Sequence, residues 1–319
     1  MIHPEIIVRV TDIAVVAESV KQFTFERVDG GSMPVFAPGA HIVVSMDDQG
    51  KLRRNPYSLM SSPSDTTSYQ ISVLRVVESR GGSAFMHEHV DVGDTMTISH
   101  PIDLFPLHAT AKRHVLIAGG IGITPFLPMM EVLNESGQVF ELHYSMRSRR
   151  RGAFLSELER RYGSRVSAEV DDEGGRLDTR KLLINQPLGT HIYVCAPLAM
   201  IDLVFGVARE LGWAEENLHR EVFLAPPAGT PFYTNLAKSG TTVYVAEHQS
   251  LLESIEAAGI DVPYLCRGGA CGQCETTVID FDGQLMHHDI FLTDDEKVSG
   301  TKIMPCVSRF VGASLTVEL

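Results

Sequence analysis

Short stretches of alternating apolar and polar residues fill the first third of the chain. Turn-forming groups such as Asp29-Gly30-Gly31 and Val92-Gly93-Asp94 separate them. Many short strands with almost no helical periodicity favour a small antiparallel barrel. The expected strands are Ile6–Val10, Lys21–Val28, His41–Met46, Tyr69–Val77 and Thr95–Ser99.

The pattern changes near residue 112, where buried strands begin to alternate with helices. His114–Ala118 is an apolar run typical of a parallel strand, and a helical stretch, Thr124–Leu133, follows it. Alternating strands and helices predict a parallel sheet built from βαβ units. The other expected elements are the strands Phe140–Met146, Arg165–Val170 and His191–Cys195, and the helices Gly152–Tyr162, Asp178–Ile184 and Leu198–Leu211.

A proline-rich segment, Pro226-Pro227-Ala228-Gly229-Thr230-Pro231, then ends all periodicity and predicts a linker. Strands are expected at Pro231–Lys238 and Thr241–Glu247, a helix from about Ser250 to Ala258, and further strands up to the end of the chain. The predicted organisation is a barrel domain (1–108), an α/β domain (109–225), a linker (226–235) and an α+β domain (236–319).

Four cysteines of the last domain form the pattern C-x4-C-x2-C followed by a distant fourth cysteine: Cys266, Cys271, Cys274 and Cys306. This spacing is the plant-type pattern for a 2Fe–2S cluster, in which each iron takes two protein sulfurs. Glycines around the second cysteine let the loop wrap closely and turn backbone N–H groups toward the cluster sulfurs. Zinc is the alternative, but zinc ribbons usually pair two C-x2-C knuckles. The pattern therefore predicts a cluster that transfers single electrons.

Composition and charge narrow the class of protein. The 319 residues are 44% hydrophobic and 21% charged, as in ordinary globular proteins of two or three domains. The net charge of −13 argues against nucleic acid or an anionic membrane as partner. We expect no membrane span and no secretion signal. Four of the five cysteines lie in one motif, which points to the reducing cytoplasm rather than to disulfides.

Two further segments could hold a phosphate-bearing ligand. Ala118–Pro125 places glycines at the end of a buried strand and before a helix, whose first N–H groups favour a phosphate, although tight strand–helix packing would use the same residues. Arg53–Pro63 places Tyr57 and Ser58 beside arginines on a barrel strand, which suits a planar ring with a phosphate tail, unless this is a solvated edge strand.

These features together resemble the phthalate dioxygenase reductase family, the flavin and iron–sulfur reductases that supply Rieske oxygenases. The resemblance covers essentially the whole chain, in the order flavin barrel, nicotinamide domain and plant-type ferredoxin domain. The segments that carry it are Tyr57-Ser58-Leu59, Arg80-Gly81-Gly82-Ser83, Gly119–Pro125, Tyr193-Val194-Cys195-Ala196-Pro197, Glu221-Val222-Phe223 and the four cysteines.

The resemblance implies roles at matching positions. The catalytic residues would be Thr124, Glu221 and Phe223, with Phe223 covering a flavin face. Alternatives without catalysis stay open: Phe223 in a core and Glu221 on a solvated strand. The cofactor-binding residues would be Arg54, Asn55, Tyr57, Ser58, Leu59, Arg80, Gly81, Gly82, Ser83, Gly119, Gly120, Gly122, Thr124, Arg147, Cys195, Ala196, Pro197 and Phe223. The four motif cysteines would be the metal ligands, while Cys195 could equally be a small buried hydrophobe.

Two positions depart from the family pattern. Asn55 stands where the family has an arginine, and the neighbouring Arg54 should face the other side of the strand. Flavin phosphate binding would then depend more on Arg80, whose Ser-Arg-Gly-Gly-Ser context is typical of an anion-binding turn. The usual Cys-Gly-Pro is Cys195-Ala196-Pro197, an extra methyl group that the nicotinamide pocket should tolerate.

The implied cofactors are FMN, from the compact family barrel, a 2Fe–2S cluster, and NADH. Asp171-Asp172-Glu173 would repel the 2′-phosphate of NADPH, but Arg147 and Arg149–Arg151 could accept it, so NADPH stays open. The flavin would take a hydride from NAD(P)H and pass electrons singly to the cluster.

The expected partner is a Rieske-type oxygenase, and the chain is expected to be a monomer. The run Asn55–Pro63 is similar to the branch that serves carnitine and related quaternary-amine monooxygenases. Vanillate-type demethylases and phthalate-type dioxygenases are the alternative partners. Two other functions stay open: a general ferredoxin-type diaphorase, and a flavin oxidoreductase of small molecules with a zinc-stabilised tail.

Overall fold

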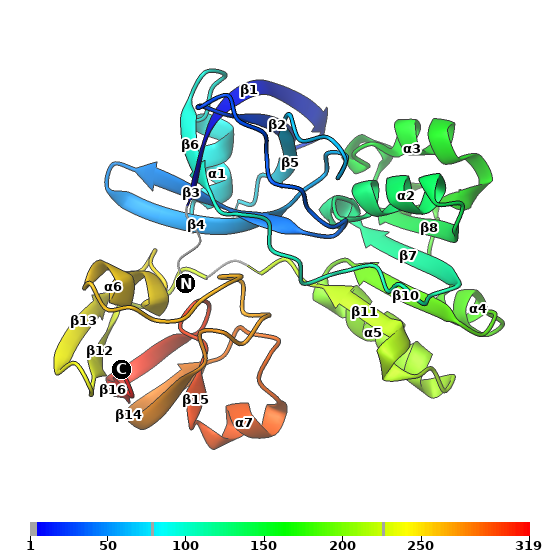
Figure 1. Ribbon diagram of the computed structural model, residues 1–319. Helices are drawn as coiled ribbons and strands as arrows, with labels where there is room; N and C mark the ends of the chain where they lie inside the picture. The colour runs from blue at the N-terminus through cyan, green and yellow to red at the C-terminus, as the bar shows by residue number, and fades with distance from the viewer. Residues whose placement is uncertain (1–4, 78–79, 225–226) are drawn as a thin grey trace. The chain divides into compact units, whose positions relative to one another are not determined.

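The computed structural model describes residues 5–77, 80–224 and 227–319, which form three sheets (Figure 1). The predicted boundary between residues 225 and 226 lies outside the described residues. Two compact units are present: Met1–Ile42, Tyr57–Arg75 and Met86–Phe223 form the first, and Val43–Pro56, Val76–Phe85 and Leu224–Leu319 form the second. Among the described residues, no helix combines the length and hydropathy that a membrane span needs.

The first sheet has six strands in the order β4-β3-β6-β1-β2-β5, which confirms the antiparallel barrel domain. Strand β1 is longer than predicted because it continues beyond a bulge between Val10 and Asp12, where the alternation of side chains shifts. A short helix, α1, lies where the sequence indicated only a turn. The bounds are β1 (Ile6–Ala17), β2 (Val20–Arg27), β3 (His41–Asp48), β4 (Lys51–Ser58), β5 (Tyr69–Leu74), α1 (Gly82–Glu88) and β6 (Thr95–Ile98).

The second sheet, within the first unit, is entirely parallel and has the order β11-β10-β7-β8-β9, as the βαβ pattern predicted. Its strands are β7 (Arg113–Gly119), β8 (Val139–Met146), β9 (Val166–Val170), β10 (Thr190–Cys195) and β11 (Leu218–Glu221). Its helices are α2 (Phe126–Glu135), α3 (Leu155–Tyr162), α4 (Thr179–Leu183) and α5 (Leu198–Glu210). Short 3₁₀ turns complete it: η1 (Gly120–Ile123), η2 (Arg149–Arg151), η3 (Gly163–Arg165), η4 (Asp171–Glu173) and η5 (Glu215–Asn217).

Helices cover both faces of this sheet (Figure 1). Leu116 and Ala118 of β7 pack with α2 and α3 on one face, while Val115 and Ile117 pack with α4 and α5 on the other. Burial on both faces explains why the strand reads as a continuous apolar run.

The third sheet, within the second unit, has the order β13-β12-β16-β14-β15. Its core includes Cys274 and Cys306, so two motif cysteines lie within the packed interior of this sheet and its helix. Strand β12 occupies the end of the range predicted as linker. The bounds are β12 (Phe232–Leu236), β13 (Thr241–Val245), α6 (Leu251–Ala257), β14 (Thr276–Met286), α7 (Asp294–Ser299), β15 (Lys302–Ile303) and β16 (Arg309–Val317).

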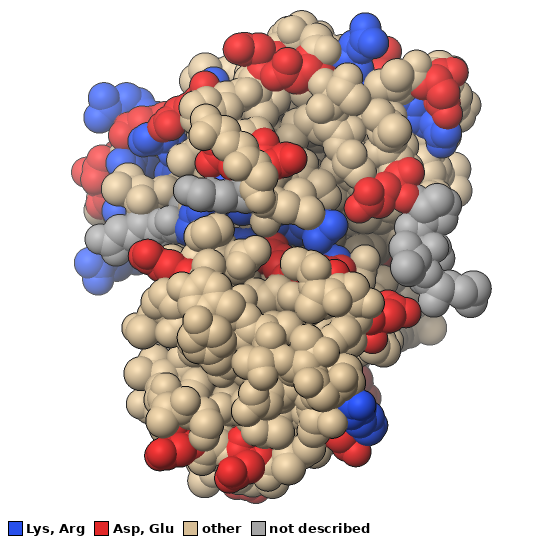
Figure 2. Space-filling model, turned by 90° about the vertical axis from the view of Figure 1, so that its left-hand side faces the viewer, with Lys and Arg blue, Asp and Glu red and all other residues tan. Residues whose placement is uncertain are grey.

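Charged side chains are dispersed on the face seen in Figure 2. Lys and Arg lie among Asp and Glu there, and large areas carry neither. The face therefore shows no continuous basic surface of the kind that binds nucleic acid.

Candidate functional site

The carboxyl ends of three parallel strands bring together the residues predicted to bind nicotinamide. Strand β7 ends at Gly119, β10 at Cys195 and β11 at Glu221. The chain starts this sheet at β7 and adds strands on both sides, so β7 and β10 flank a topological switch point. Open α/β sheets bind ligands at such points, outside the carboxyl ends of the strands.

The glycine turn after β7 packs directly on the segment after β10. A Cβ on Gly122 would lie 2.0 Å from the carbonyl oxygen of Cys195, and one on Gly119 would lie 2.8 Å from the Cβ of Ala196 and the Cδ of Pro197. Gly120 differs, because it has a φ of +55° and open space where a Cβ would stand. The backbone at Gly120 is therefore the part of the turn that a ligand can approach.

Thr124 ends this turn and is buried. Its hydroxyl donates a hydrogen bond to the carbonyl oxygen of Ile121 at 3.1 Å. Because that proton is engaged inside the turn, the Thr124 hydroxyl can serve a ligand only as an acceptor.

Glu221 is held in a poorly solvated position beside Ser58. The Ser58 hydroxyl donates to Oε2 of Glu221 at 3.4 Å. Burial raises the pKa of Glu221 to about 8, with a smaller rise from Asp103, while the Ser58 hydrogen bond lowers it. Burial, and then Glu221, also raise the pKa of the Cys195 thiol. Both groups therefore carry their protons at neutral pH.

Three other predicted residues of the first unit differ in exposure. Phe223 is 45% exposed and follows β11, so its ring is available for stacking. Tyr57 is half-buried. Leu59 is fully buried in the barrel core, and its N–H donates to the carbonyl oxygen of Ala40 at 2.9 Å, so its side chain has a packing role.

The groups that bear on NADH or NADPH lie at neighbouring strand ends. The carbonyl oxygen of Arg147, after β8, accepts a hydrogen bond from the N–H of Asp172, after β9, at 3.1 Å. Nε of Arg149 lies 2.8 Å from Oε1 of Glu173 and neutralises one of the predicted repelling carboxylates. The arrangement is therefore compatible with either NADH or NADPH as the reductant.

The four motif cysteines lie in two pairs in the second unit. The thiols of Cys266 and Cys271 interact, as do those of Cys274 and Cys306. Within each pair the hydrogen bond between the thiols lowers the pKa of one member, that of Cys266 to about 5 and also that of Cys274. The same hydrogen bond, together with burial, raises the pKa of the other member, Cys271 or Cys306. A thiolate is the form that binds metal, and two pairs suit two irons that each take two protein sulfurs.

Backbone geometry shapes the loop that holds these thiols. Arg267, Gly269 and Gly272 all have positive φ. The N–H of Gly268 donates to the sulfur of Cys266 at 3.4 Å. The loop thus turns a backbone donor toward a sulfur, as a bound cluster requires, so the residues present fit a 2Fe–2S cluster.

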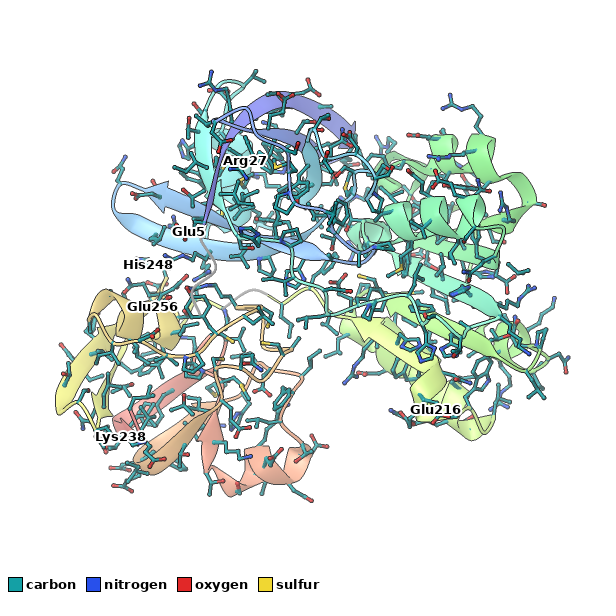
Figure 3. The ribbon with its side chains drawn as sticks, in the orientation of Figure 1. Glu5, Arg27, Glu216, Lys238, His248 and Glu256 are labelled. Atoms are coloured by element: carbon teal, nitrogen blue, oxygen red, sulfur yellow. The ribbon has the colours of Figure 1, made fainter. Side chains whose placement is uncertain are left out.

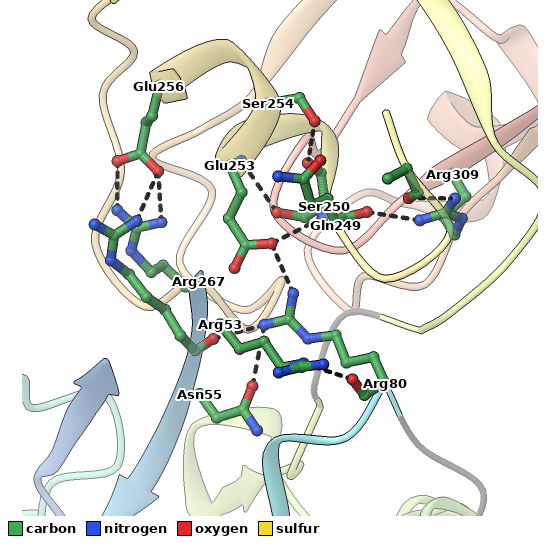
Figure 4. Close-up of polar contacts among 12 residues, drawn as sticks. Arg53, Asn55, Arg80, Gln249, Ser250, Glu253, Ser254, Glu256, Arg267 and Arg309 are labelled. Atoms are coloured by element: carbon green, nitrogen blue, oxygen red, sulfur yellow. Dashed lines mark hydrogen bonds and ion pairs between the residues drawn. The ribbon is translucent and has the colours of Figure 1, made fainter. Parts of the chain in front are cut away.

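Arg80, the predicted phosphate ligand, is buried and strongly engaged (Figure 4). Its Nη1 donates to Oε2 of Glu253 at 2.7 Å, and its Nη2 donates to Oδ1 of Asn55 at 3.1 Å. Its Nε is buried without a hydrogen-bond partner among the described residues. An amide oxygen at position 55 accepts from Arg80, whereas an arginine there would repel it, which gives the departure at Asn55 a physical reason.

The turn after Arg80 is close to β4. Gly81 has a φ of +98°, and a Cβ on Gly82 would lie 2.4 Å from Nδ2 of Asn55. The hydroxyl of Ser83 accepts a hydrogen bond from the N–H of Val76 at 3.1 Å. The predicted phosphate turn therefore packs against the strand that carries Asn55. The buried Nε–H of Arg80, which has no hydrogen-bond partner within the described part of the chain, fits an anionic group.

The sequence interpretation missed two carboxylates of α6, Glu253 and Glu256. Glu253 completes a capping box with Ser250, and this S-x-x-E pattern is visible in the sequence. Glu256 pairs with Arg54 of β4 at 3.4 Å. No local pattern could connect residues so far apart in the chain.

Comparisons with known proteins agree with this arrangement. Residues 234–311, which contain all four motif cysteines, match the 2Fe-2S iron-sulfur cluster binding domain. Residues 98–218 match the N-terminal domain described as dimethylamine monooxygenase subunit DmmA-like. The structure of a phthalate dioxygenase reductase superposes with a TM-score of 0.90 at 33% identity, over 99% of this chain and 98% of that one.

The chain belongs to the phthalate dioxygenase reductase-like family. It is 43% identical to the carnitine monooxygenase reductase subunit of Acinetobacter baumannii, over 97% of this chain and 96% of that protein. It is 41% identical to the heme-dependent oxidative N-demethylase beta subunit of Ectopseudomonas mendocina, over 98% of each. As a member, it is an oxidoreductase of an oxygenase system that uses NAD(P)H, a flavin and a 2Fe–2S cluster.

Proposed function

We propose that this reductase passes electrons from NAD(P)H through FMN and a 2Fe–2S cluster to an oxygenase that acts on carnitine or a related amine. The match of residues 234–311 to the 2Fe–2S domain, together with the glycine turn at the β7–β10 switch point, carries the proposal. When bound, the flavin accepts two electrons together and releases them singly to the cluster.

The first unit would bind the nicotinamide. Gly120 leaves the backbone open, while Gly119 and Gly122 let the turn close on Cys195–Pro197. The protonated Glu221 and the Thr124 oxygen would orient the polar groups of the nicotinamide ring. The exposed Phe223 would cover a face of the flavin ring until the nicotinamide displaces it. None of these residues needs to act as a general base, because hydride transfer needs orientation rather than proton removal.

The other predicted residues would hold the flavin and the cluster. Tyr57 and Ser58 would contact the flavin. Arg80, through an Nε–H with no hydrogen-bond partner in the described ranges, and the backbone of Gly81–Ser83 would bind the flavin phosphate. We favour FMN because this turn leaves little loop for an adenosine half. Cys266, Cys271, Cys274 and Cys306 would be the cluster ligands, and their free thiols favour a reducing compartment such as the cytoplasm.

The partner's substrate class is proposed from the relatives. The 43% identical reductase subunit is named for carnitine monooxygenase, which favours a carnitine-type Rieske oxygenase. A haem-dependent N-demethylase is the second candidate, because a 41% identical relative carries that name and residues 98–218 match the DmmA-like domain. Both names concern oxidation of alkylated amines.

Coupled turnover separates these candidates. The purified reductase, NADH and either a carnitine-type Rieske oxygenase or a haem-dependent N-demethylase are mixed with the cognate substrate, and product is measured against NADH consumed. We expect tightly coupled product formation with the carnitine-type enzyme. Efficient coupling with the haem enzyme alone would select the second candidate, and coupling with neither would reject the amine assignment.

A further inference from the structure

One carboxylate in the second unit bridges two arginines from distant parts of the chain (Figure 4). Glu256 of α6 accepts from Nη1 and Nη2 of Arg267 at 2.8 and 2.5 Å, and its Oε2 lies 3.4 Å from Nη1 of Arg54. Arg54 belongs to β4, the strand of the flavin motif, and Arg267 directly follows Cys266. A single side chain of the second unit therefore joins β4, at Arg54, to the cluster loop.

A second bridge lies one turn earlier on the same helix. Glu253 accepts from Arg80 at 2.7 Å, and the two side chains are only 5% and 1% exposed. Residues three apart share a helix face, so both carboxylates of α6 point to the same side. Buried ion pairs of this kind add geometric definition rather than net stability, because desolvation offsets most of their attraction.

The loop conformation at Arg267 depends on these contacts. Arg267 has a φ of +51°, which a residue with a side chain rarely adopts. Its guanidinium lies 3.8 Å from the ring centroid of Tyr264, is 5% exposed and is held by Glu256. Surrounding contacts are what sustain such a backbone conformation, and Glu256 is among them.

We propose that Glu256 and Glu253 are positioning residues for electron transfer from the flavin to the cluster. Glu256 fixes Arg54 of β4 to the loop that begins at Cys266, and Glu253 fixes the Arg80 turn to the same helix. Together they hold the predicted phosphate turn in register with the acceptor loop of the second unit. The step moves one electron from reduced flavin to oxidised cluster, with NADH as the reductant, and no bond forms or breaks. This inference rests on the proposed function.

The chain offers a matched control. Glu318 pairs with Lys238 at 3.4 Å in the same unit, and both side chains are well exposed. Figure 3 labels Lys238 and Glu256 and shows them at separate places in this unit. Glu318→Gln therefore removes the same charge without touching the α6 bridges.

The test is rapid anaerobic mixing of the holoprotein with NADH, with flavin and cluster absorbance followed separately. We expect Glu256→Gln and Glu253→Gln to slow cluster reduction at least tenfold, while the rate of flavin reduction and the ferricyanide reductase activity stay within twofold of wild type. The electron paramagnetic resonance spectrum of the cluster should be unchanged, which a merely structural defect would alter. Glu318→Gln should behave as wild type.

Cluster reduction within twofold of wild type in both variants overturns the proposal. If Glu256→Gln loses its cluster, Glu253→Gln decides alone, because its partner Arg80 lies outside the cluster loop, and an unchanged rate there also overturns it. A wild-type protein whose flavin and cluster are reduced by neither NADH nor NADPH would instead contradict the proposed function itself.

Discussion

Glu221 is the residue whose chemistry depends most on its surroundings. A solvated strand glutamate would be ionised at pH 7, but burial raises the pKa of Glu221 to about 8. Glu221 thereby supplies a neutral hydrogen-bonding group beside Cys195, and it adds no negative charge where an anionic dinucleotide is expected.

This shift predicts a pH-dependent stability. The folded pKa lies above the ordinary value of 4.5, so the protonated carboxyl favours the folded state below pH 4.5, and that contribution is lost as the pH rises toward 8. Because a glutamine side chain does not ionise, Glu221→Gln should not lose this stability as the pH rises. Its melting temperature should match that of wild type at pH 5 and exceed it at pH 9, which reflects about 1–2 kcal/mol after allowance for partial exposure. An equal difference at both pH values would show that Glu221 is ionised at neutral pH.

Gly122 is the most tightly packed glycine of the nicotinamide turn. Gly122→Ala would place a methyl group 2.0 Å from the Cys195 carbonyl oxygen, a backbone atom that cannot rotate away. We expect a loss of more than about 3 kcal/mol, or a displaced turn with strongly raised KM for NADH. Thermal melting measures the loss of stability, and NADH–ferricyanide kinetics measure the change in KM.

Gly206→Ala is the control, because Gly206 lies inside α5 with open space around it. It should be neutral or stabilise by about 1 kcal/mol. Equal behaviour of the two variants would contradict the close packing of the turn.

At the scale of elements, the cluster loop depends on its backbone as much as on its thiols. A Cβ on Gly269, whose φ is +72°, would lie 2.6 Å from Cγ2 of Val307 and 3.1 Å from Cα of Asp289. Gly269→Ala should therefore retain less iron and acid-labile sulfide per chain than wild type.

Gly259→Ala is the matched control. Its φ is +77° in the same unit, but no described atom lies within 4 Å of the added methyl group. Both variants have the left-handed cost of about 1–2 kcal/mol, so only the collision distinguishes them. Full cluster content in Gly269→Ala would show that the loop can move enough to accommodate the added methyl group.

The elements themselves were largely predictable, because periodicity follows from burial. The buried run His114–Ala118 predicted β7, and alternation predicted the barrel strands. Helix α1 was not predicted because Gly82-Ser83 is typical of a turn rather than of a helix start. The extension of β1 was not predicted because the bulge after Val10 shifts the alternation of apolar and polar residues along the strand.

The site was predictable only in part. Motif spacing located the cysteines and the glycine turn, since those constraints are local in sequence. The raised pKa of Glu221, the engagement of Arg80 by Glu253 and the Arg54–Glu256–Arg267 bridge come from tertiary packing. No periodicity or propensity encodes such contacts between distant segments.

At the scale of the whole molecule, a single chain transfers electrons from NAD(P)H through a flavin to a 2Fe–2S cluster. The fold, the family and the cysteine motif all support this route, and the oxygenase is the electron acceptor. The acidic net charge of −13 suits a partner with a basic docking surface, so reduction of the oxygenase should slow as ionic strength rises. A rate independent of salt would exclude electrostatic docking.

The most direct test is the spectrum of freshly purified protein before and after anaerobic addition of NADH, with iron and acid-labile sulfide measured on the same sample. We predict a red-brown protein with about two irons and two sulfides per chain, one FMN, and loss of both flavin and cluster absorbance on reduction. A plain yellow protein that contains zinc and loses only flavin absorbance would contradict the account.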